Sequence, residues 1–168
     1  YFTASGNEAY TLVNLIFSNK NQPTAITDIM EMPNEDIWLA SWGSGVRILD
    51  KQLRMKESQL YKNPPPANWL PEWKNAVRLT WAMCRQSATG LVWIGCNGGI
   101  ILLHDPEKGT TQYMRPDVCN GSTIRFIEED KKGTIWFGTQ SGKLIKYENG
   151  VFQVVYEIGT IIYKIFID

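Results

Sequence analysis

The chain has 168 residues, the size of one ordinary domain, and its 17 basic side chains balance its 17 acidic ones. A net charge of zero gives no electrostatic reason to expect a nucleic acid or an anionic membrane surface as a partner. No apolar run approaches the roughly 20 residues that cross a bilayer, so we expect no direct membrane insertion by this segment.

The chain has three cysteines, Cys84, Cys96 and Cys119, which are widely spaced and form no Cys-x-x-Cys pair. This spacing argues against a zinc site and allows at most one disulfide. Cys96 lies in a predicted strand, where a buried and inert thiol is expected. We predict no metal site and no cofactor.

In chain order, a Trp-containing hairpin occurs three times. Its copies are "DIWLASWGSGVRIL" (36–49), "LVWIGCNGGIILLH" (91–104) and "TIWFGTQSGKLIKY" (134–147). Each copy follows a first strand signal, such as "AITDIMEM" or "STIRFIEE", and precedes a fourth, such as "RMKESQL" or "FQVVYEI". A repeat of about forty residues with four strands is typical of a propeller blade.

The two ends of the chain continue the same pattern. "YFTASG" (1–6) aligns with "FGTQSG" (137–142), and "IYKIFID" (162–168) aligns with "IRFIEED" (124–130). We therefore predict an all-β fold of four-stranded antiparallel meanders, a partial β-propeller of about three full blades and two part-blades. The predicted segments are a part-blade at 1–24, blades at 25–61, 77–117 and 122–158, a Pro- and Trp-rich connection at 62–76, and a first strand at 161–168.

The unit at 124–147, with its "IWFGT" strand and the glycine after it, resembles the two-component regulator propeller repeat. Copy 77–104 keeps "VWIG" and the glycine pair, whereas copy 26–49 has Ala40-Ser41 in place of Gly-Thr. The resemblance implies that the chain is a fragment of the extracytoplasmic sensor region of a bacterial hybrid two-component histidine kinase. It also implies a periplasmic location, oligosaccharide ligands and a non-catalytic role in signal transduction.

Two other functions remain open. One is a protein–protein interaction propeller without a small ligand. The other is a propeller lyase similar to streptogramin lyases, whose chemistry needs a metal and a histidine-based acid and base. The single histidine, His104, argues against a lyase, and no catalytic residue is predicted.

Candidate ligand-binding residues lie on one face of the predicted propeller, where the turns between second and third strands meet the connections between blades. Indole rings can stack on the C–H faces of sugars, while polar side chains bind the hydroxyl groups. Trp42 interrupts the repeat in a turn expanded by one residue. Trp69 and Trp73 either face a ligand or fold back over the blade below. The complete set is Asp28, Trp42, Trp69, Trp73, Trp81, Asn97, Arg125 and Gln140.

The repeated Trp38, Trp93 and Trp136 are expected in the core between blades instead. The part-blades at the ends have exposed strand edges, which favour association. They could complete one blade within the chain, pair between two chains, or join the remaining blades of a longer parent chain.

Overall fold

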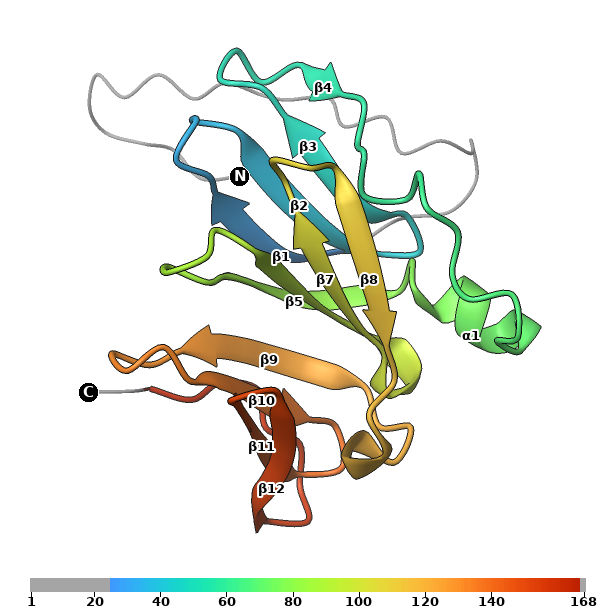
Figure 1. Ribbon diagram of the computed structural model, residues 1–168, viewed down its shortest axis with the longest axis vertical. Coiled ribbons are helices and arrows are strands. Elements are labelled where there is room, and N and C mark those ends of the chain that lie inside the picture. Colours follow the sequence, from blue (N-terminus) through green and yellow to red (C-terminus); the bar gives the residue numbers. More distant parts are fainter. Residues whose placement is uncertain (1–24, 167–168) are drawn as a thin grey trace, which may run out of the picture.

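The computed structural model describes residues 25–166, and they form three four-stranded antiparallel sheets (Figure 1). Within this range no helix is long and apolar enough to span a membrane. The first sheet contains β1 (Ala25–Glu31), β2 (Ile37–Trp42), β3 (Gly45–Leu49) and β4 (Met55–Lys56). The second contains β5 (Thr80–Arg85), β6 (Val92–Cys96), β7 (Ile101–Asp105) and β8 (Thr110–Met114). The third contains β9 (Ile124–Glu129), β10 (Ile135–Thr139), β11 (Lys143–Glu148) and β12 (Val151–Glu157).

Each sheet is a meander in which strands pair in chain order, as the sequence predicts for a blade. The sheets fan out from their first strands, so that β1, β5 and β9 are neighbours and the fourth strands lie outermost (Figure 1). Hydrogen bonds join β1 directly to β5: the Thr27 hydroxyl donates to the Thr80 carbonyl over 2.8 Å. The structure confirms a partial propeller.

Aromatic side chains fill the space between neighbouring sheets. Trp93 is buried, and its ring lies 5.7 Å from Phe137 and 4.8 Å from Tyr147, both in the third sheet. Trp38 is also buried and contacts His104 of the second sheet with ring centroids 5.8 Å apart. Both tryptophans lie in the core between blades, as predicted, and this burial of large apolar surface holds one sheet against the next. The third, Trp136, does not lie there: it is only partly buried, and its Nε1 donates to Asp130 of the same blade.

A glycine in the second strand of a blade makes room for an isoleucine of the next blade. A Cβ on Gly95 would lie 2.5 Å from Cγ2 of Ile124, and a Cβ on Gly138 would lie 2.6 Å from Cγ2 of Ile162. Ile162 therefore occupies against the third sheet the place that Ile124 occupies against the second. No strand is assigned over residues 161–166, although a first strand is predicted at 161–168.

The part-blade at 1–24 and residues 167–168 lie outside the described residues. The connection at 62–76, predicted as an extended arm, ends in helix α1 (Pro71–Ala76). Pro71 has no backbone N–H, and it is tolerated in the first turn because residues there donate no hydrogen bond within the helix. In the first blade, the polar segment "RMKESQL" (54–60) keeps only the two residues of β4 in strand pairing.

Candidate ligand-binding site

The propeller has two faces with different kinds of loop. The connection face holds the turns between second and third strands and the connections between blades, including α1 and the short 3-10 helices η1 (Asn97–Gly99) and η2 (Asp117–Cys119) (Figure 1, right). The turn face holds the turns between first and second strands (Figure 1, left) and those between third and fourth strands. The predicted site residues come mainly from elements at the connection face.

A β-bulge recurs near the start of every first strand. The pairing with the second strand shifts between Ile26 and Asp28, between Thr80 and Ala82, and between Ile124 and Phe126. A bulge inserts one unpaired residue and re-aims its side chain. The inserted residues are Thr27, Trp81 and Arg125, which occupy equivalent positions in the three blades.

Trp42, Trp81, Arg125 and Gln140 form a continuous row across the three sheets, here named the Trp–Arg row. The rings of Trp42 and Trp81 have centroids 6.2 Å apart and planes inclined by 34°. The Cζ atom of Arg125 lies 3.6 Å from the centroid of the Trp81 ring, a close cation–π contact. Nε of Arg125 then donates to Oε1 of Gln140 over 2.8 Å. Four of the eight predicted residues are therefore connected by three successive contacts.

The row combines an accessible aromatic surface with fixed polar groups. Trp42 is 53% exposed although it is among the largest apolar side chains of the protein. Trp81 is half-buried, and its Nε1 has no hydrogen-bond partner among the described residues. A large exposed ring beside an anchored guanidinium is a common composition for a surface that binds another molecule.

Two other predicted residues are held by protein groups. Asp28 accepts hydrogen bonds from the backbone N–H groups of Met83 (2.7 Å) and Ile29 (2.9 Å), so its carboxylate joins the first two blades. Burial raises the pKa of Asp28 above its ordinary value. The side-chain oxygen of Asn97 accepts a hydrogen bond from the Thr123 hydroxyl, which links the second and third blades.

Trp69 and Trp73 fold back onto the blades and do not face a ligand site. Both are partly buried against the apolar core between the first two blades. The Trp69 ring meets Trp73 and Tyr113 edge-on, with centroids 6.2 Å apart in each case. Arg115 covers the Trp73 ring at 4.3 Å. Through these contacts the two tryptophans attach the connection at 62–76 to the second blade.

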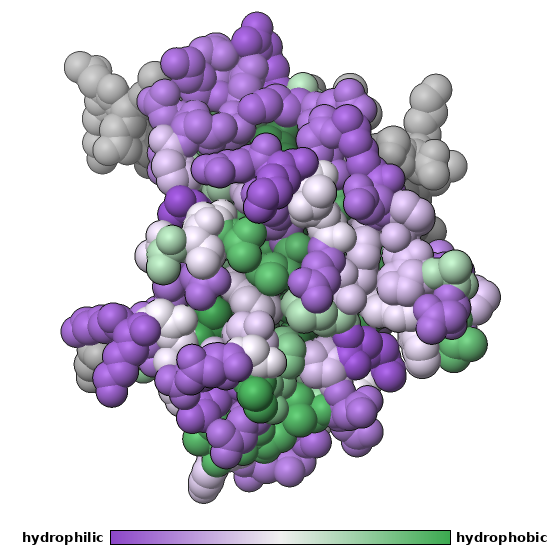
Figure 2. Space-filling model, viewed as in Figure 1, coloured by the Kyte–Doolittle hydropathy of each residue, from purple (hydrophilic) through white to green (hydrophobic). Residues whose placement is uncertain are grey.

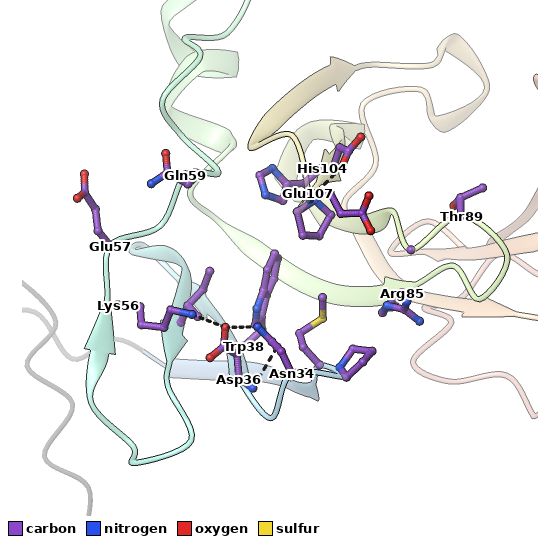
Figure 3. A pocket seen from close by; sticks show the side chains of 16 residues that line it. Asn34, Asp36, Trp38, Lys56, Glu57, Gln59, Arg85, Thr89, His104 and Glu107 are labelled. Atoms are coloured by element: carbon purple, nitrogen blue, oxygen red, sulfur yellow. Dashed lines mark hydrogen bonds and ion pairs between the residues drawn. The ribbon is translucent and has the colours of Figure 1, made fainter.

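Sequence reasoning missed a cleft on the turn face, between the first and second blades (Figure 3). Its volume is about 490 Å³, and Trp38, Asp36, Lys56, His104 and Glu107 are among its lining residues. Asp36 accepts from Lys56 Nζ over 2.6 Å and from the Asn34 amide over 2.8 Å. Three polar side chains of this cleft, Asp36, Lys56 and Asn34, therefore already bind one another. The lining residues come from several separate turns, and no motif in the sequence connects them.

His104 is buried in this cleft wall and has a structural partner. The Thr111 hydroxyl donates its only proton to the Leu60 carbonyl over 2.7 Å, so Nδ1 of His104 must donate to the Thr111 oxygen at 2.9 Å. Burial lowers the pKa of His104 below its ordinary value. Among the described residues no group of three or more His, Cys, Asp or Glu side chains could hold a metal ion.

Residues 120–141 match the family model described as "Two component regulator propeller". This segment is similar to the two-component regulator propeller repeat. The matched segment includes Arg125 and Gln140 of the Trp–Arg row and the whole of β10. No curated protein matches the sequence.

Solved structures with a fold similar to that of this chain include the extracellular domains of two hybrid two-component systems. One is the extracellular domain of the hybrid two-component system BT4673 from B. thetaiotaomicron, with a TM-score of 0.64 and 19% identity over 84% of this chain. The other is that of the hybrid two-component system BT3049 from the same organism, with a TM-score of 0.62 and 20% identity over 86% of this chain. This chain spans 19% and 18% of their lengths, respectively.

A third similar structure is YCF48 bound to D1 peptide, with a TM-score of 0.58 and 14% identity over 83% of this chain and 43% of that one. At these identities the three likenesses establish the propeller fold.

Proposed function

We propose that this propeller is a non-catalytic sensing domain that binds an oligosaccharide on its Trp–Arg row. In this proposal it belongs to the periplasmic part of a two-component histidine kinase, and the output is signal transduction. The observation that carries the proposal is the row itself: an exposed Trp42, a stacked Trp81 and a hydrogen-bonded Arg125 on one face. The repeat at 120–141 and the sensor-domain neighbours support the class of protein.

A sugar ring suits the chemistry of the row. Its apolar C–H face can lie on the exposed ring of Trp42, while its hydroxyl groups can exchange hydrogen bonds with Arg125 and Gln140. Because the two ends of the row belong to the first and third sheets, a ligand that reaches both must extend over more than one ring. This span favours an oligosaccharide over a monosaccharide.

The row also offers a physical route from binding to signalling. Its members belong to three sheets, which contact one another mainly through packed side chains. A ligand that bridges Trp42 and Gln140 stabilises one relative position of these sheets more than any other. Ligand binding then shifts the equilibrium between blade arrangements by its differential affinity for them.

A protein-interaction scaffold is the second candidate, and a separate observation favours it. Several large apolar side chains at the last blade are exposed, and Figure 2 shows apolar residues gathered over this sheet. They include Val151, Val155, Tyr156 and Ile158. Further blades of the parent chain or a second copy of this chain would cover such a surface. One neighbour of the same fold, YCF48, is bound to a peptide in its structure.

Isothermal titration with a panel of defined tri- and tetrasaccharides tests the proposal. We expect at least one saccharide to bind, and Trp42→Ala to weaken its affinity about fivefold or more through loss of the stacking surface. Tyr156→Ala, which removes another exposed aromatic ring outside the row, should leave the affinity unchanged. Absence of binding across the panel, or equal losses in both variants, would contradict an oligosaccharide site on this row.

A further inference from the structure

Charge is distributed unevenly between the two faces, although the whole chain is neutral. Apart from Asp28, whose carboxylate is bound by two backbone N–H groups, the three acidic side chains of the connection face within the described residues are Glu72, Asp117 and Glu157. The basic side chains there are twice as many: Lys62, Lys74, Arg78, Arg115, Arg125 and Lys143. This excess of positive charge lies on the same face as the Trp–Arg row.

The ion pairs are found on the opposite face. They all lie at, or within a few residues of, turns between first and second or between third and fourth strands: Lys51–Glu35, Arg54–Asp50, Lys56–Asp36, Lys108–Asp105 and Lys146–Glu148. No arginine of the connection face forms an ion pair within residues 25–166. The cations of that face are therefore not neutralised by described carboxylates.

Each arginine of the connection face lies over an aromatic ring instead. Arg78 lies over Tyr61 at 4.3 Å, and Arg115 lies over Trp73 at the same distance. Arg125 lies over Trp81 at 3.6 Å. Energetically significant contacts of this kind occur about once per 70 to 80 residues, so three on one face of this small protein exceed expectation. Stacking on a ring fixes the plane of a guanidinium and leaves the N–H groups at its edge available to bind an anion.

Arg125 is the best placed of the three. Its Nε binds Gln140 and its Cζ lies over Trp81, so both contacts restrain the same group. An arginine fixed in this way can direct its remaining N–H groups to a carboxylate or sulfate in a bidentate arrangement. Trp42, two positions along the row, would support the sugar ring that carries the anionic group.

We propose that the ligand of this face is an acidic oligosaccharide, and that Arg125 binds its carboxylate or sulfate group. This inference rests on the proposed function, because it specifies the chemistry of the saccharide on the Trp–Arg row. An anionic ligand supplies the negative charge that the described residues of this face lack, and it gains specificity because a neutral sugar leaves the cations unpaired.

Calorimetric titration with matched saccharides tests the inference. The first pair is trigalacturonate and its fully methyl-esterified form, which has the same rings without the charge. The second pair is a sulfated disaccharide of a glycosaminoglycan and its desulfated form. We expect an acidic member to bind about tenfold or more tightly than its neutral partner. The pair that shows the difference identifies carboxylate or sulfate.

Two arginine variants complete the experiment. Arg125→Gln should remove most of the preference for the acidic member, whereas Arg54→Gln, on the turn face, should leave it unchanged. Raising the salt concentration should weaken binding of the acidic member more than that of the neutral one. Equal affinities for acidic and neutral members would overturn the acidic specificity and leave the proposed function intact. Absence of binding by either pair and by the neutral panel would overturn both.

Discussion

Ile29 and Ile127 are the same residue type at equivalent positions of two blades, in opposite environments. Ile127 on β9 is 4% exposed because the second blade covers it, whereas Ile29 on β1 is 63% exposed. Truncation of a buried isoleucine to alanine costs about 2–5 kcal/mol of unfolding free energy. Most of the Ile29 side chain stays in solvent, so Ile29→Ala should cost no more than about 1 kcal/mol. We predict a difference of at least about 1 kcal/mol between the two variants.

Urea unfolding followed by tryptophan fluorescence measures both variants under the same conditions. The slope with denaturant should stay constant, so that a shift in midpoint reports stability alone. Equal losses in the two variants would show that Ile29 is covered in solution. That result would refute the reasoning that β1 presents a blade face without a neighbour within the described residues.

Three further predictions follow from individual contacts. Gly95→Ala should lower the unfolding free energy by about 1–3 kcal/mol, because the new methyl group would lie 2.5 Å from Ile124 Cγ2. In urea unfolding, the double variant with Ile124→Ala should lose less unfolding free energy than the two single variants lose together. Burial lowers the pKa of His104 in the folded state, so the unfolded chain binds a proton first as the pH falls. The folded state should therefore lose stability below about pH 6.5, and His104→Asn should make the unfolding midpoint less dependent on pH in that range. The thiols of Cys96 and Cys119 are fully buried, and burial raises the pKa of Cys119 to about 12, so both should react with a disulfide reagent at pH about 8 only after the chain unfolds.

Most of the fold could be predicted from the sequence because packing between blades requires the same residue types at the same position of each repeat. Trp38 and Trp93 recur at one position since each fills the space between two blades. Gly95 and Gly138 recur because an isoleucine of the following blade lies against each of them. Helix α1 could not be predicted, since six residues are too few to establish a helical period.

The candidate site could be predicted only as a set of residues on one face. Trp42, Trp81, Arg125 and Gln140 were expected there because propeller topology brings strand ends together. Their stacking depends on the bulges that insert Trp81 and Arg125, and a one-residue change in strand pairing leaves no clear mark in the sequence. The role of Asp28 in joining two blades could not be predicted either, because its partner is a backbone N–H group of another blade and backbone groups leave no mark in the sequence.

The central claim is that a ligand binds on the Trp–Arg row, and the indole N–H signals test it most directly. The protein has seven tryptophans, and ¹⁵N labelling of tryptophan gives each an assignable signal in a two-dimensional NMR spectrum. Titration with the tightest saccharide of the panel should shift the signals of Trp42 and Trp81. The signal of Trp136, whose Nε1 donates to Asp130 near the turn face, should stay in place. Shifts confined to Trp38, which lines the cleft of the turn face, or no shift at saturation, would contradict the claim.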